Sequence, residues 1–228
     1  MVILKTTDYE GPQMEPPNSS DNKSTTETGK NRPDAPVDLR DWLERIEEAG
    51  ELRRITAPVR LDEELGAITY MAARDEAAPA LLFDKFEERE SDVRVVSNML
   101  GASRRRFALA VGLDPDGSTR ELITAMRGRM KRRIPPVEVM AESAPVNDRI
   151  LFGEDIDITR LPAPKFWPND GGPYIGTGDI TFTRAPDSDR INVGVYRQMV
   201  QGPRRVGMYC SPGKHGKLDR EAWWARGE

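Results

Sequence analysis

The sequence changes character at a pair of prolines, Pro135 and Pro136. Before them, apolar residues with helical spacing alternate with short apolar runs. After them, proline and glycine cluster, as in LPAPKFWPNDGGPYIGTG, and alternating strand patterns follow. Consecutive prolines end a helix because proline lacks the backbone N–H. We therefore expect an α+β protein with a small α/β domain at 37–134 and a β-rich domain at 135–228.

The elements of the first domain follow from apolar spacing and capping residues. Gly50 stands where a left-handed helix C-terminus would be, and Asp62 can cap a second helix. Ser118 and Glu121 form a capping box at the start of a third. The expected helices cover residues 38–49, 62–74 and 118–133, and the expected strands cover residues 52–59, 80–83 and 93–97.

The second domain shows alternation typical of an antiparallel meander. Strands are expected over 178–184, 190–201 and 206–211, and a helical pattern begins at Leu218. Three strands and a partial helix leave apolar faces uncovered. We therefore expect this β domain to be incomplete in the chain.

Residues 1–36 differ from both domains. From Tyr9 onward they are rich in proline, serine, threonine, asparagine and charge, with almost nothing apolar to offset the entropy of ordering. We expect a disordered tail.

The charge balance and cysteine count exclude several classes of protein. A net charge of −4 and a pI near 5.4 argue against a nucleic-acid binder, and the basic run 127–133 complements the dipole of a helix C-terminus. The single cysteine, Cys210, rules out an internal disulfide and suits a small apolar filler. No signal peptide or membrane span is evident, so we expect a cytoplasmic protein.

The residues most suited to chemistry lie at 191–216, which holds the only histidine and the only cysteine. The strand period of two places Asn192 and Tyr196 on one face and Arg197 on the other. Bringing Asn192 and Arg197 to one ligand would need a bulge or sharp twist, for which Gly194 is a natural position.

The segment SPGKHGK follows the last expected strand. Its two glycines can let backbone N–H groups approach an anion, and Lys214 adds charge, but no P-loop pattern is present. A lone histidine such as His215 is more often a surface or hydrogen-bonded residue than a metal ligand. One imidazole and one amide do not complete a metal site, so Mg²⁺ or Mn²⁺ would also need carboxylates, phosphates or waters.

Five segments carry a resemblance to a known family. In chain order they are DLRDWLERIEEAGELRRI, PALLFDKF, FGEDIDITRLPAPKFWPNDGGPYI, TGDITFTRAPDSDRINVGVYRQMV and SPGKHG. From Asp38 onward the chain resembles the N-terminal half of the UbiD family of prenylated-FMN-dependent decarboxylases. The resemblance implies an α/β N-terminal domain followed by a split β-barrel of the flavin-reductase type.

The resemblance also implies roles for individual residues. Asn192 and His215 would bind a divalent metal, usually Mn²⁺, that anchors the flavin phosphate, and K⁺ is a further candidate cation. Arg197 would hold the substrate carboxylate. The implied cofactor contacts are Asn192, Val195, Tyr196, Arg197, Ser211, Lys214 and His215.

The implied reaction is the reversible, non-oxidative decarboxylation of an aromatic or α,β-unsaturated acid. The family's third metal ligand, a glutamate, and its catalytic acidic residues have no counterpart in the chain. We therefore expect the chain to be a truncated, cofactor-anchoring half with little activity alone, and the full-length protein to form a homo-oligomer. The alternative is a non-catalytic flavin-binding or assembly subunit, completed by a second polypeptide.

Overall fold

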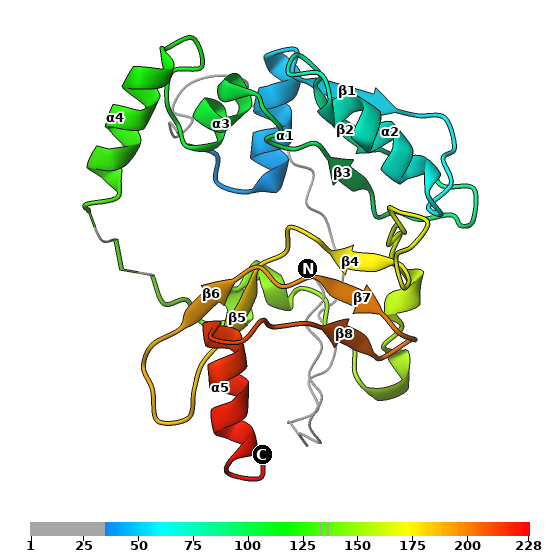
Figure 1. The fold of residues 1–228 in the computed structure, drawn as a ribbon, viewed down its shortest axis with the longest axis vertical. Coiled ribbons are helices and arrows are strands. Elements are labelled where there is room, and N and C mark those ends of the chain that lie inside the picture. Colours follow the sequence, from blue (N-terminus) through cyan, green and yellow to red (C-terminus); the bar gives the residue numbers. More distant parts are fainter. Residues whose placement is uncertain (1–34, 133, 136) are drawn as a thin grey trace.

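The computed structural model describes residues 35–132, 134–135 and 137–228 (Figure 1). The expected disordered tail, residues 1–36, lies outside the described residues except for Ala35 and Pro36. The described residues form two parts, one before and one after Pro135.

The first part holds four helices and a small mixed sheet among its described residues. The elements are α1 (Leu39–Glu48), β1 (Leu52–Ile55), α2 (Glu64–Ala73), β2 (Ala80–Phe83), β3 (Val95–Ser97), α3 (Arg104–Ala110) and α4 (Thr119–Arg129). The strand order is β1-β2-β3, in which β2 runs parallel to β1 and antiparallel to β3. The middle strand, β2, is buried along its whole length.

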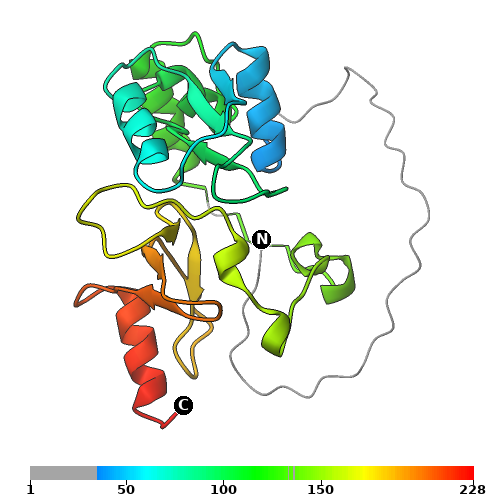
Figure 2. The same ribbon diagram turned by 90° about the vertical axis from the view of Figure 1, so that its right-hand side faces the viewer.

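The two faces of β2 meet different helices. Ala80 packs in a cluster with Trp42, Leu43 and Ile46 of α1, whereas Leu81 and Phe83 pack in a second cluster with Leu65 of α2. This follows from the strand period of two, which sends alternate side chains to opposite faces. Figure 2 shows α1 and α2 on either side of the strands. The core therefore consists of two small clusters separated by the sheet.

Two of the expected helix boundaries are confirmed. Asp38 caps α1 by accepting a hydrogen bond from the Asp41 backbone N–H, and Gly50 after its end has a φ of +73°. At α4, the capping box between Ser118 and Glu121 is complete. Such local bonding depends on sequence neighbours alone, which is why the sequence predicts it well.

Other expectations for this part were wrong. Asp62 does not cap α2: the residue before the helix is Glu63, which has a φ of +66° and no side-chain cap. Helix α4 ends at Arg129 rather than Arg133, and β1 ends at Ile55, well before the expected end at Val59. Val59 instead forms an isolated bridge with Phe86.

Helix α3, which contains Arg104, Arg105 and Arg106, was not expected from the sequence. Arg106 is in fact 1% exposed, and its guanidinium donates to the Glu51 carboxylate at 2.9 Å and to the Met99 carbonyl at 2.8 Å. A buried guanidinium needs such partners, and they tie α3 to the loop before β1.

The second part contains short 3₁₀ turns and small antiparallel sheets. Its strands and helix are β4 (Tyr174–Gly176), β5 (Thr181–Thr183), β6 (Asn192–Gly194), β7 (Gln198–Val200), β8 (Val206–Met208) and α5 (His215–Trp224). The strands form two sheets, ordered β4-β7-β8 and β5-β6. No closed barrel is formed by the described residues, and the flavin-reductase type of split barrel stays a prediction.

The expected meander needs correction. The strand predicted over 190–201 is two strands, β6 and β7, which belong to different sheets. Strand β4 was not expected, and α5 begins at His215 rather than Leu218. Among the described residues, no helix is long and apolar enough to cross a bilayer.

The two parts meet through the segment that contains Lys165. Its backbone N–H donates to the Leu61 carbonyl at 3.0 Å, and its carbonyl accepts from the Glu63 N–H at 2.9 Å. The Lys165 ammonium lies 3.1 Å from the Glu63 carboxylate, and this hydrogen bond raises the lysine pKa. Next to it, Gly66 of α2 lies so close to Phe166 that a Cβ there would be 2.5 Å from the Phe166 carbonyl oxygen. These contacts fix the second part against α2.

Candidate functional site

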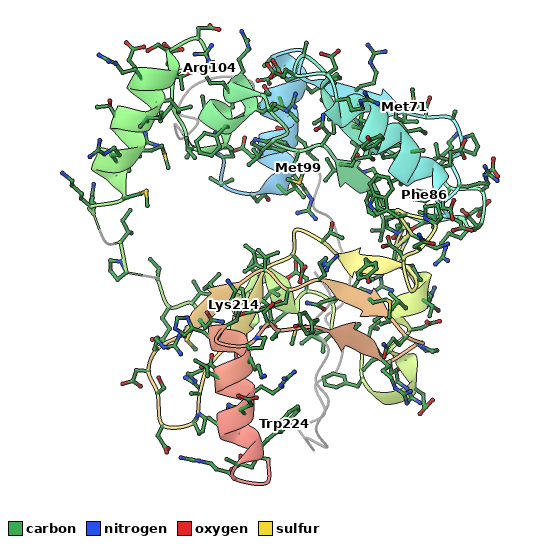
Figure 3. All side chains as sticks on the ribbon, viewed as in Figure 1. Met71, Phe86, Met99, Arg104, Lys214 and Trp224 are labelled. Atoms are coloured by element: carbon green, nitrogen blue, oxygen red, sulfur yellow. The ribbon has the colours of Figure 1, made fainter. Side chains whose placement is uncertain are left out.

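One pocket gathers every residue that the sequence singled out as a site residue. Its volume is about 430 Å³. Its walls are β6, the segment from β6 to β7, the chain after β8 and the start of α5; Figure 3 shows Lys214 at the N-terminal end of that helix. The predicted residues that line it are Asn192, Val195, Tyr196, Arg197, Ser211, Lys214 and His215. The structure brings these side chains together, and their chemical roles stay predictions.

A break in the strand allows this gathering. Strand β6 ends at Gly194, and the chain leaves its ladder with β5 before β7 begins at Gln198. Arg197 therefore lines the same pocket as Asn192, although a regular strand would direct them to opposite faces. The irregularity expected near Gly194 is thus present, as a change of sheet rather than a single bulge.

Tyr196 explains why glycine is needed at two positions here. Its ring is 8% exposed and lies between Gly194 and Gly216. A Cβ on Gly194 would lie 2.6 Å from the ring, and a Cβ on Gly216 would lie 2.7 Å from it. The Tyr196 hydroxyl accepts a hydrogen bond from the Gly216 backbone N–H at 3.0 Å. The ring thus joins β6 to the first turn of α5.

Asn192 is buried and held by its amide nitrogen. Its Nδ2 donates to the Thr183 hydroxyl at 2.9 Å and, more weakly, to the Tyr196 hydroxyl at 3.4 Å. No described residue donates a hydrogen bond to its amide oxygen, and Asn192 lines the pocket. An amide oxygen in this situation is a suitable ligand for a hard cation.

The charged residues that line the pocket are cationic. Arg197 and Lys214 are exposed, and neither forms an ion pair with a described residue; among the lining residues there is no carboxylate. Lys214 is the N-cap of α5, and His215 is its first residue. A helix N-terminus carries partial positive charge, which adds to that of Lys214, so this end of the pocket favours an anion such as a phosphate.

The described residues do not by themselves complete a metal site. They contain no cluster of three histidine, cysteine, aspartate or glutamate side chains suited to a metal. Asn192 and His215 would supply one oxygen and one nitrogen, which suits Mn²⁺ if phosphate oxygens, waters or other ligands fill the remaining positions. The residues present thus fit a metal that is shared with a bound phosphate.

A second pocket, of about 240 Å³, adjoins the first through Arg197. Its other lining residues are Phe166, Trp167, Asp170, Tyr174 and Thr177. Neither these residues nor Tyr209 in the first pocket were among the site residues predicted from the sequence. The clustered aromatic residues of the KFWPNDGGPY segment were an available signal, but only the fold places them beside Arg197.

Cys210 lies outside both linings. It is 4% exposed and carries a free thiol. Its burial agrees with the expected role as a small apolar filler.

Comparison with protein families gives two matches. Residues 43–126 match the model of the 3-octaprenyl-4-hydroxybenzoate carboxy-lyase N-terminal domain. Residues 137–228 match the model of the 3-octaprenyl-4-hydroxybenzoate carboxy-lyase Rift-related domain. The two matches follow each other in one chain and lie on the two parts described above.

The solved structures that resemble this chain include decarboxylases and a UbiD-class enzyme. The closed form of vanillic acid decarboxylase from Sedimentibacter hydroxybenzoicus matches 83% of this chain with a TM-score of 0.75 and 30% identity. The UbiD-class enzyme HmfF from Pelotomaculum thermopropionicum, an evolved dimeric form in complex with prFMN, matches 80% with a TM-score of 0.66 and 30% identity. Apo 3,4-dihydroxybenzoic acid decarboxylase from Klebsiella pneumoniae matches 83% with a TM-score of 0.70 and 26% identity.

These matches cover 40%, 41% and 40% of the respective solved chains. The chain thus spans about two-fifths of the length of the structures that it resembles.

Proposed function

Because the chain belongs to the UbiD family of carboxy-lyases, we propose that it supplies the cofactor-anchoring part of a prenylated-FMN-dependent decarboxylase. The substrate would be an aromatic or α,β-unsaturated carboxylic acid. The observation that carries this proposal is the pocket in which all seven predicted site residues meet.

The anchoring end of the pocket would be Asn192, His215 and Lys214. Asn192 presents an amide oxygen and His215 an imidazole to a divalent metal, for which Mn²⁺ is the first candidate. Lys214 and the N-terminus of α5 add positive charge that would stabilise the flavin phosphate. Ser211, Val195 and Tyr209, from the remaining walls, would contact the rest of the flavin. K⁺ stays a further candidate cation.

The substrate end would be Arg197. Its guanidinium is exposed, lacks an ion-pair partner among the described residues and borders both pockets. A planar guanidinium can donate two parallel hydrogen bonds to a carboxylate. The aromatic walls of the smaller pocket would then suit the planar body of an aromatic or acrylic acid.

The bound prenylated flavin would supply the electron sink that loss of CO₂ requires. The chain's own contribution would be to hold the cofactor phosphate and to fix the substrate carboxylate with Arg197. The lining of the first pocket contains no carboxylic acid to protonate the product, and the carboxylate that lines the smaller pocket, Asp170, already accepts a hydrogen bond from the Trp167 backbone N–H at 3.1 Å. We propose that this acid comes from a part of the protein beyond these residues or from a second polypeptide.

The test is reconstitution of the full-length protein with prenylated FMN and Mn²⁺, followed by a screen of aromatic and acrylic acids for CO₂ release. Arg197→Ala should abolish turnover of protein loaded with prenylated FMN, and Arg205→Ala, at an exposed arginine outside both pockets, should retain it. Flavin binding without CO₂ release from any acid would favour the alternative of a non-catalytic flavin-binding or assembly subunit. Homo-oligomerisation and a cytoplasmic location stay predictions.

A further inference from the structure

A buried carboxylate, Asp219, connects the two predicted metal ligands. It lies on the helix that begins with His215, and it reaches Asn192 through Thr183. Asn192 begins β6 and His215 begins α5, so nothing in the local backbone fixes one relative to the other. Asp219 lies one helical turn after His215, and its side chain is buried against the β5–β6 pair. Thr183 of β5 lies between Asp219 and Asn192.

The contacts form a continuous chain. The Thr183 hydroxyl donates to Asp219 Oδ2 at 2.6 Å, and Asn192 Nδ2 donates to that same hydroxyl oxygen at 2.9 Å. The other carboxylate oxygen, Oδ1, accepts from the Arg190 guanidinium at 2.9 Å. Asp219 is 2% exposed, and these two bonds give each of its oxygens a partner.

The chemistry of these groups fixes the direction of every hydrogen bond. An ionised carboxylate only accepts, so Thr183 must donate its single proton to Asp219. The Thr183 oxygen can then only accept from Asn192, and therefore Asn192 turns its NH₂ group inward. Its amide oxygen is left on the pocket side, which is the orientation that a cation requires.

The same carboxylate also positions the helix. Residues four apart lie on one face of a helix, so holding Asp219 against Thr183 holds the turn that begins with His215. Tyr196 provides a second connection, since its hydroxyl receives both the Gly216 N–H and, more weakly, Asn192 Nδ2.

We propose that Asp219, acting through Thr183, is a positioning residue that sets the amide orientation of Asn192 and the place of His215 for cation binding. The inference rests on the proposed function, because it concerns the metal site assigned there. A purely structural role for Asp219 would stabilise the fold without any effect on the metal affinity of the folded protein.

The test is Mn²⁺ affinity of the full-length protein with FMN present, measured by the electron paramagnetic resonance signal of free Mn²⁺. In Asp219→Asn the new amide can donate a hydrogen bond to the Thr183 hydroxyl, which can then donate to Asn192 and turn its amide round. Thr183→Val removes both hydrogen bonds of the hydroxyl at nearly constant side-chain volume. We expect each to weaken Mn²⁺ binding by about 10- to 100-fold, the usual effect of losing a partner behind a metal ligand. Thr183→Ser keeps the hydroxyl and should retain wild-type affinity.

Glu221→Gln is the matched control, because Glu221 is paired with Lys217 on the exposed side of the same helix. It should leave Mn²⁺ affinity unchanged. Thermal melting of each variant identifies the folded ones; if Asp219→Asn does not fold, the comparison of Thr183→Val with Thr183→Ser decides. Folded Asp219→Asn or Thr183→Val protein with wild-type Mn²⁺ affinity would overturn the positioning role of Asp219 and leave the proposed function standing. Wild-type protein that takes up neither FMN nor Mn²⁺ would overturn the proposed function, and the inference with it.

Discussion

Replacing Gly194 by alanine tests the packing that shapes the pocket. A Cβ at this position would lie 2.6 Å from a ring carbon of Tyr196 and 2.9 Å from its hydroxyl oxygen. Carbon atoms in contact prefer about 3.5–4.0 Å, so the ring must move by about 1 Å. The ring is buried and also lies in close contact with Gly216, so it has little space into which to move.

The magnitude follows from two effects. Overpacking in a filled interior costs about 1–3 kcal/mol. Displacing the ring also breaks the hydrogen bond between the Tyr196 hydroxyl and the Gly216 N–H, worth about 0.5–1.5 kcal/mol. Gly194→Ala should therefore lower the free energy of unfolding by about 1.5–4.5 kcal/mol and weaken FMN binding in the folded fraction.

The assay is urea denaturation of the full-length protein, followed by tryptophan fluorescence. Gly128→Ala is the control, because nothing lies within 4 Å of a Cβ at Gly128 in α4, and alanine there should stabilise by about 0.5–1 kcal/mol. In a Tyr196→Leu background the collision is gone, so Gly194→Ala should cost little. An equal loss of stability with and without the tyrosine ring would show that the Tyr196 ring is not what excludes a side chain at position 194.

Three further predictions concern single side chains. Tyr196→Phe leaves the buried Gly216 N–H without its acceptor and should cost about 1–3 kcal/mol in urea denaturation; an unchanged midpoint and slope would contradict this. Arg197→Lys keeps the charge but loses the two-donor fork, so KM for the acid should rise about tenfold in steady-state kinetics, and an unchanged KM would speak against this role. The Glu121 carboxylate accepts hydrogen bonds from the Ser118 backbone N–H, which has the larger effect, and from the Ser118 hydroxyl, and both lower its pKa. The cap therefore stabilises α4 fully at pH values above the ordinary glutamate pKa, and this stabilisation is lost as the pH falls through the lowered pKa. Destabilisation by Glu121→Gln should therefore shrink in acid, and a pH-independent difference would argue against it.

The sequence predicted best what depends on neighbouring residues. The caps at Asp38 and Ser118 and the buried strand at 80–83 need only local hydrogen bonding or a short apolar run. Helix α3 was missed because its stability depends on the Arg106–Glu51 pair, whose members are far apart in the chain. Asp62 failed as a cap because the Lys165 segment pairs with the backbone at 61–63 and sets its conformation.

The site was predicted as a set of residues but not as an arrangement. The sequence pattern and the family resemblance identified the residues of the pocket. The side-chain alternation of a regular strand, however, predicted that Asn192 and Arg197 point to opposite faces. The change of sheet after Gly194 resolves this, and it depends on the burial of Tyr196 against α5. Asp219 was not selected, because its function depends on its distance from Thr183, which only the fold determines.

Mn²⁺-dependent flavin binding tests most directly whether Asn192 and His215 hold a cation that anchors a flavin phosphate. The affinities of FMN and of riboflavin, which lacks the phosphate, are measured with and without Mn²⁺ for the full-length wild-type protein and for Asn192→Ala and His215→Ala. We expect Mn²⁺ to tighten the binding of FMN but not of riboflavin, and either substitution to remove this difference. Equal tightening of both flavins, or an undiminished Mn²⁺ effect in either variant, would contradict it.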